Sequence, residues 1–332
     1  MGSATETLCG QAFGAGQKDM ADLAGSFALL VIPQFLSLAF NFPTQKFLQA
    51  QNLGLTGAAI AFDVTSWGIT LAQLVYVVGW CKDGWNGLSW LALKDIWSFV
   101  RLSIASAVML CLEVWYMMSL IVLAGHLDNA IIAVDSISIC MNYNGWEGMI
   151  FIGVNAAISV RVSNELGLRH PRAAKYSVYV TVFQSLFIGI FFMGVILLTK
   201  DYFAIVFTNS KTLQAAVANL GNLLAVTMVL NSVQPVISGV AVGGGWQALV
   251  AYINVGCYYL FGLPLGYLLG YTAELGVKGL WGGMICGILL QTLLLMGILY
   301  KTNWNKEVDN TTARVQQWGG QAIEVDKTLA SA

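Results

Sequence analysis

The sequence predicts an all-α polytopic membrane protein, on the basis of its composition and of the length of its apolar runs. Of the 332 residues, 57% are hydrophobic and 10% are charged, whereas soluble domains carry about a quarter charged residues. The mean hydropathy is +0.70, and apolar runs of about 20 residues, the length that crosses a bilayer, recur along the chain. The net charge of -1 gives no indication of a nucleic-acid partner.

Eight segments have the length and apolarity of a transmembrane helix. They are Leu23–Phe42, Leu55–Trp80, Ile96–Ala124, Ile131–Val160, Tyr176–Thr199, Leu213–Val242, Ala248–Tyr271 and Val277–Tyr300. The segment that follows them, residues 301–332, is polar and is predicted to form a flexible tail. The chain is therefore expected to cross the bilayer about eight times.

Basic residues are distributed unevenly over the short loops between these segments. The loop after the fourth segment is the richest, with Arg161, Arg169, Arg172 and Lys175. Because loops rich in Lys and Arg stay on the cytosolic side of a membrane, we place this loop in the cytosol. Residues 81–95 and the tail alternate correctly to lie on the same side.

The motifs of common enzyme classes are absent from the sequence. There is no nucleophile elbow, P-loop or dinucleotide-binding fingerprint. The two histidines, His126 and His170, fit no metal-ligand spacing, and the six scattered cysteines are interpreted as packing residues. We therefore expect neither an enzyme nor a metal site.

Four acidic residues fall within predicted spans: Asp63, Glu113, Asp135 and Glu147. A charge at mid-membrane costs about 2.5–3.5 kcal/mol on insertion scales, and no Lys or Arg lies deep in a span to pair with them. Protonation, a bound cation or a water-filled cavity would relieve this cost. Glu113, Glu147 and Asp135 are therefore candidates for proton coupling. The alternatives are a polar bond from Glu113 to a neighbouring helix and a position of Asp135 at the membrane interface.

Amide, hydroxyl and aromatic side chains in the apolar segments predict a substrate cavity. The candidates are Asn144, Asn155, Asn231, Gln234, Ser238, Tyr252 and Tyr258. Pro235 breaks the hydrogen-bond ladder of its helix and is a candidate hinge. A packing kink at the proline, and aromatic residues that anchor the helix at the interface, are the structural alternatives.

Several strings carry a resemblance to a known family. They are CLEVWY at residues 111–116, NAAISVRVSNELG at 155–167, QPVISGVA at 234–241, GGGWQ at 243–247 and YKTNWNKE at 300–307. These strings resemble the plant branch of the multidrug and toxic compound extrusion (MATE) family, and most of all its vacuolar flavonoid transporters. The resemblance implies twelve helices in two lobes of six, and a role for Glu113 in proton coupling and substrate release.

The first half is short when it is compared with the second half. Glu165 and Pro235 are 70 positions apart, whereas the matching Glu6 and Pro43 are only 37 apart. A second matching pair is closer by 26 positions. Each difference is about one helix plus a loop, so we infer that helices corresponding to the third and fifth are missing, along with the first and most of the second. The alternative is a family with a naturally minimal first half.

These inferences define the expected domains. They are a remnant of an N-lobe helix end at 1–22, an incomplete two-helix N-lobe at 23–80, a cytosolic loop at 81–95, an intact six-helix C-lobe at 96–300 and the cytosolic tail at 301–332. The sequence therefore contains all six helices expected of the second lobe, but not all of those expected of the first.

The resemblance implies a secondary antiporter, a monomer that exports or sequesters flavonoid-like or xenobiotic organic solutes in exchange for protons. The proton gradient is the energy source and no cofactor is expected. A multi-pass protein of the vacuolar membrane is expected, with the plasma membrane as the alternative. Two other interpretations are an anion-channel-like conductor of the vacuolar membrane and a non-functional product of a truncated transcript or gene model.

Overall fold

The chain divides into two compact units, one formed by Met1–Gly16 with Asp95–Ala332 and the other by Gln17–Lys94. The computed structural model describes Gln11, a few positions between 63 and 79, and residues 96–127 and 129–317. The predicted span Leu23–Phe42 and most of Leu55–Trp80 lie outside the described residues. The fold is therefore described for the unit that contains Asp95–Ala332.

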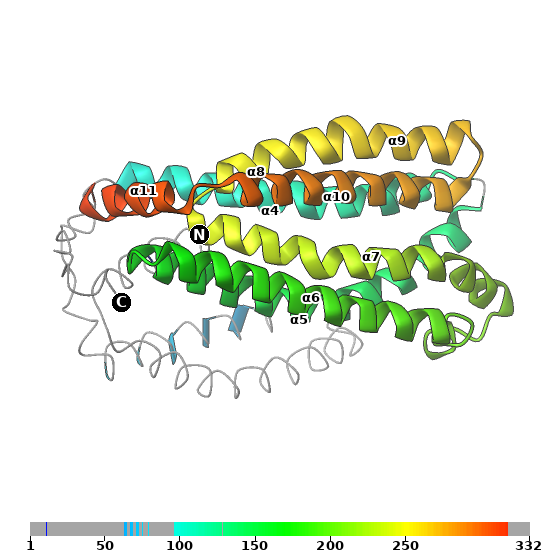
Figure 1. Cartoon of the computed structure of the whole chain (residues 1–332). Helices are drawn as coiled ribbons and strands as arrows, with labels where there is room; N and C mark the ends of the chain where they lie inside the picture. Colours follow the sequence, from blue (N-terminus) through cyan, green and yellow to red (C-terminus); the bar gives the residue numbers. More distant parts are fainter. Residues whose placement is uncertain are drawn as a thin grey trace. The chain divides into compact units, whose positions relative to one another are not determined.

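The described part of this unit is built of helices, without strands, and the predicted all-α class is confirmed (Figure 1). The long helices are α4 (Ile96–Ala124), α5 (Ala130–Gly167), α6 (Pro171–Thr199), α7 (Lys211–Gly244) and α10 (Gly276–Lys301). A short 3-10 turn, η2 (Phe203–Val206), precedes α7. Four consecutive helical pieces make up the rod between α7 and α10: α8 (Gln247–Asn254), η3 (Val255–Gly262), α9 (Leu263–Tyr267) and η4 (Leu268–Thr272). Each of the six segments predicted between residues 96 and 300 corresponds to one of these rods.

Five described helices are long and apolar enough to cross a membrane. They are Val100–Ala124, Pro171–Thr199, Lys211–Gly244, Gln247–Thr272 and Gly276–Lys301. The predicted span Ile131–Val160 lies within α5 and is not among them, because Asn142, Asn144, Glu147 and Asn155 lower its hydropathy. These polar residues distinguish α5 from the other five rods.

The helices pack around a core to which α4, α5, α7 and α10 all contribute. Leu120, Ile137, Leu224 and Trp281 are fully or almost fully buried and belong to one apolar cluster. The indole Nε1 of Trp281 donates to Thr227 Oγ1 on α7 at 3.1 Å, so the polar atom of this large side chain is satisfied inside the core.

Two glycines on α7 allow it to approach α5 closely. A Cβ at Gly239 would lie 2.5 Å from the carbonyl oxygen of Asn155, and a Cβ at Gly243 would lie 2.5 Å from that of Ser159. The two contacts are four residues apart on both helices, so α5 and α7 run in the same direction with a constant register. Figure 1 shows α5, α6 and α7 as neighbours.

The expectation of a flexible tail over residues 301–332 is wrong for its first half, which forms α11 (Trp304–Gln317). The segment has a low hydropathy, but it forms an amphipathic helix. Its buried Val308 packs with side chains of α5 and α6. On the same helix, Arg314 Nη1 donates to the carbonyl oxygen of Gly244 at 3.0 Å. A cation at the carboxyl end of α7 is electrostatically favourable.

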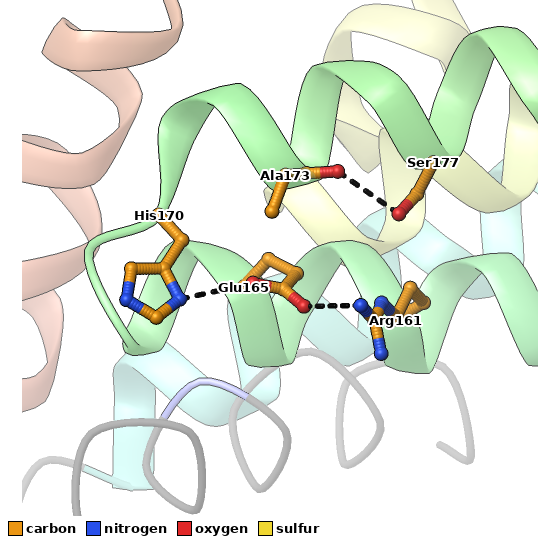
Figure 2. A network of polar contacts seen from close by, with 5 residues as sticks. All are labelled: Arg161, Glu165, His170, Ala173 and Ser177. Carbon is orange, nitrogen blue, oxygen red and sulfur yellow. Dashed lines mark hydrogen bonds and ion pairs between the residues drawn. The ribbon is translucent and has the colours of Figure 1, made fainter. Parts of the chain in front are cut away.

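A small ionic network joins the end of α5 to the start of α6 (Figure 2). Glu165 receives Arg161 Nη2 on one carboxylate oxygen at 2.7 Å, and His170 Nδ1 lies 3.3 Å from the other. The Glu165 side chain is only 8% exposed, whereas its two partners are mostly exposed. The network fixes the turn between these two helices.

We expect Gly239→Ala to lower the free energy of unfolding by about 1–3 kcal/mol, because the added methyl group forces α7 away from α5. The measurement is denaturation of the purified chain in detergent. Gly153→Ala on α5 is the matched control, since a Cβ there meets nothing within 4 Å. Equal stability of the two variants would show that the close approach is absent.

Candidate functional site

The carboxyl group of Glu113 lies between three helices. It projects from α4, and its Oε1 accepts hydrogen bonds from Gln234 Nε2 on α7 at 3.0 Å and from Asn254 Nδ2 on α8 at 3.3 Å. On α4 it follows Met109 by four residues and precedes Tyr116 by three, and both of these are buried. This spacing is one face of a helix, which turns the acid toward its neighbours.

Further amide and hydroxyl groups extend this contact into a buried polar cluster. Gln234 Nε2 also lies 3.2 Å from Ser238 Oγ, and Gln291 Nε2 on α10 donates to Asn254 Oδ1 at 3.2 Å. We name Glu113, Gln234, Ser238, Asn254 and Gln291 the amide cluster. Its four uncharged members are at most 8% exposed, so the cluster connects four helices inside the bundle.

Sequence reasoning selected Glu113, Gln234 and Ser238 but did not include Asn254 or Gln291 among the site residues. The signal was present for Gln291, which is the only amide side chain in the span Val277–Tyr300. An isolated amide in an apolar helix needs a partner, because hydrocarbon offers none. Its partner could not be identified from spacing alone.

The two tyrosines predicted to line the cavity occupy different environments. Tyr258 is 2% exposed and stacks on Tyr116, with ring centroids 4.3 Å apart and an angle of 4° between the planes. The Tyr116 hydroxyl donates to the carbonyl oxygen of Met284 at 3.0 Å. Tyr252 is 79% exposed and lies outside the amide cluster.

Two further polar contacts join α5 to α7. Asn231 Nδ2 donates to Asn144 Oδ1 at 2.8 Å, and Asn155 Nδ2 donates to the carbonyl oxygen of Pro235 at 2.6 Å. The four residues were all candidates from the sequence. The structure brings them together in pairs along the α5–α7 contact, where Pro235 lies inside the continuous helix α7.

The remaining two acids differ from Glu113. Glu147 on α5 is 2% exposed, and within the described part of the chain both of its carboxyl oxygens are buried without a hydrogen-bond partner. Asp135 is exposed on the first turns of the same helix. The proton-coupling role of all three acids remains a prediction, but the structure separates them into a hydrogen-bonded acid, a buried acid without partners and an exposed acid.

Two open grooves mark the surface of the described residues, and the amide cluster lines neither of them. The larger, of about 570 Å³, lies between α4 and the η3–α9 segment and is lined mainly by Trp115, Met118, Tyr259 and Tyr267. The smaller, of about 360 Å³, lies near Asn129 and Lys278. Of the predicted cavity residues, Gln234, Ser238 and Tyr258 are buried, whereas Tyr252 is exposed.

We expect Asn254→Leu to destabilise the chain by about 1–3 kcal/mol, because it removes one donor to Glu113 and leaves Gln291 without an acceptor. Unfolding in detergent measures the effect. Asn142→Leu on the exposed side of α5 is the control and should change stability by at most about 0.5 kcal/mol. A neutral result for Asn254→Leu would mean that the cluster does not hold these helices together.

The chain is similar to known membrane transporters. A family model described as MatE matches residues 105–268. Protein DETOXIFICATION 35 of Arabidopsis thaliana is 60% identical, with 99% of this chain and 81% of that protein covered. Protein DETOXIFICATION 34 of the same plant is 55% identical, with 98% of this chain and 73% of that protein covered. The alignment with the former runs over 397 positions, against 332 residues here, which confirms the predicted internal shortening.

Solved structures agree with these relatives. The crystal structure of the eukaryotic MATE transporter AtDTX14 has a TM-score of 0.79 and 28% identity, and covers 94% of this chain and 85% of that one. The MATE transporter ClbM in complex with Rb+ has a TM-score of 0.68 at 14% identity, over 92% of this chain and 84% of that one, and supports the fold alone. The chain therefore belongs to the MATE family of membrane transporters, which are not enzymes.

Proposed function

We propose that this transporter is a secondary antiporter that moves organic solutes in exchange for protons, with Glu113 as the coupling group. The observation that supports it is the position of one carboxyl between Gln234 and Asn254, inside the helix bundle. A carboxyl in such a place can bind a proton and release it. Its charged and neutral forms require different hydrogen bonds, so a change of protonation changes its contacts with the neighbouring helices.

The cluster offers a way to transmit protonation to α7. As a carboxylate, Glu113 accepts from Gln234 and Asn254. Once protonated, it accepts less strongly and has an O–H to donate. Gln234 already has an alternative partner in Ser238 Oγ at 3.2 Å. A change in the bonding of Gln234 therefore acts on α7 next to Pro235, where the helix lacks one backbone donor.

The proposed substrates are flavonoid-like or xenobiotic organic solutes, and the proposed location is the vacuolar membrane, with the plasma membrane as the alternative. Polar amides beside the stacked Tyr116 and Tyr258 suit a polar aromatic solute. The name of the two relatives, DETOXIFICATION, is consistent with xenobiotic solutes. We propose a monomer as the working unit.

An anion-conducting channel is less well supported by the residues of the described spans. The ionisable side chains that lie deep in them, Glu113 and Glu147, are acidic, whereas anion pores use rings of basic residues.

The internal shortening also bears on turnover, because a missing pair of helices removes part of the wall of the first lobe. We propose that the 332-residue chain transports far less than a version with these helices restored.

The test compares proteoliposomes that hold the restored version, with and without a proton gradient. We expect uptake of a labelled flavonoid that collapses when the gradient is dissipated, and loss of this uptake in Glu113→Gln, which keeps the size of the side chain but cannot titrate. Asp201→Asn, at an exposed acid in the loop after α6, should transport normally.

Three results would contradict the proposal. Gradient-driven uptake that survives in Glu113→Gln would remove this residue from the mechanism. Flux that follows the membrane potential without a proton gradient would favour the channel. Full transport by the 332-residue chain would show that the missing helices are dispensable.

A further inference from the structure

Glu147 is a buried acid for which the proposed role of Glu113 gives no explanation. It is 2% exposed on α5, and neither of its carboxyl oxygens has a hydrogen-bond partner among the described residues. An ionised carboxylate without partners is among the most expensive groups to bury, whereas a neutral carboxyl needs only one acceptor for its O–H. The surroundings of Glu147 should therefore contain an acceptor.

The register of α5 and α7 shows which residue lies at the height of Glu147. Gly239 lies against Asn155, and eight residues earlier on each helix are Asn231 and Glu147. The side chain of Asn231 supports this placement, because it bonds Asn144, one turn before Glu147 on the same face of α5.

Asn231 is the residue whose carbonyl group loses its helical donor. In an α-helix the carbonyl of residue i accepts from the N–H of residue i+4. Four residues after Asn231 is Pro235, which has no N–H and lies in the interior of α7. A buried acid without a partner and a carbonyl without its usual donor thus lie at one height on two helices in contact.

We propose that the protonated carboxyl of Glu147 donates its O–H to the carbonyl of Asn231, which lacks a helical donor because Pro235 has no N–H. Loss of this proton breaks the bond and allows α7 to bend at the proline. Glu147 would be a proton-binding group distinct from Glu113. Its partner lies on the α5 side of α7, whereas Glu113 bonds Gln234 and Asn254. The inference rests on the proposed antiport only for its role in turnover, because the contact itself does not require transport.

Few other ionisable groups among the described residues face this position. Beyond Lys211, α7 has no ionisable side chain, and α6 has none after Tyr179. On α4 the nearest acid is Glu113, which is engaged in the amide cluster. On α5 itself Asp135 is exposed, Tyr143 donates to the carbonyl oxygen of Phe203 at 3.0 Å, and the buried thiol of Cys140 lies two turns before Glu147. The charged residues of α11 lie at the other end of α5, beyond Ile158.

A compact site favours a proton over a metal ion. An alkali ion needs several oxygen ligands at once, while an O–H needs one acceptor. Neither of the two surface grooves described above includes Glu147. The dependence of stability on sodium at constant pH is nevertheless part of the test.

The experiment is a double-mutant cycle on the full chain in lipid nanodiscs, read as the melting temperature at several pH values. Glu147→Met removes the donor at similar size, and Pro235→Ala restores a backbone N–H to the Asn231 carbonyl. We expect Glu147→Met to lower the melting temperature by several degrees at low pH. In the Pro235→Ala background this fall should be at least halved, because the carbonyl is already satisfied.

Glu147→Gln supplies the second readout. Its amide N–H donates at every pH, so this variant should match the original chain at low pH. The stability that the Glu147 proton contributes is present at low pH and is lost as the pH rises, so Glu147→Gln should become the more stable of the two at high pH. Asp135→Asn, an exposed acid on the same helix, should not show this divergence.

Two outcomes would overturn the inference. An equal effect of Glu147→Met with and without Pro235→Ala would show that the two positions do not interact. A difference between Glu147→Gln and the original chain that follows sodium at constant pH, and not the pH, would assign the site to a metal ion. Neither outcome depends on transport, so a failure of the antiport proposal would be recognised separately.

Discussion

The hydrogen bonds that meet the Glu113 carboxyl are the interaction on which the arrangement of the described helices, α4 to α11, depends. An acid at this depth cannot face lipid at an acceptable cost, so the rotation of α4 about its axis is fixed by the positions of the available donors. Gln234 and Asn254 are these donors, and Asn254 is in turn held by Gln291. One carboxyl thereby determines how α4, α7, α8 and α10 are oriented around each other.

Helix α7 connects this cluster to the rest of the bundle. It presents Gln234 to Glu113, and it presents Asn231 and Gly239 to α5. Because the glycine contacts leave no space between α5 and α7, the two helices are expected to move together in their C-terminal halves. The proline is the place where α7 can bend without losing a further hydrogen bond, so polar groups on both sides of it can bias the same bend.

Much of the described fold could be predicted from the sequence, because membrane crossing depends on little more than the length and apolarity of a segment. All six rods between residues 96 and 300 were found in this way. Helix α11 was missed, since its apolar stripe at Trp304 and Val308 lies in a polar sequence and gains stability only by packing on α5 and α6. In the site, residue type identified Glu113 and Gln234. The exposure of Tyr252 and the partnership with Gln291 depend on how each helix is rotated, which composition does not specify.

The central claim is that Glu113 gains and loses a proton within the amide cluster. The most direct measurement is the infrared difference spectrum of the chain in lipid nanodiscs as the pH is raised, with glutamate isotopically labelled at its side-chain carboxyl. We predict that part of the carboxylic-acid carbonyl band of the labelled glutamates disappears with rising pH, and that this part is absent from Glu113→Gln. An unchanged pH-dependent band in Glu113→Gln would contradict the account, since the proton would then reside on other residues.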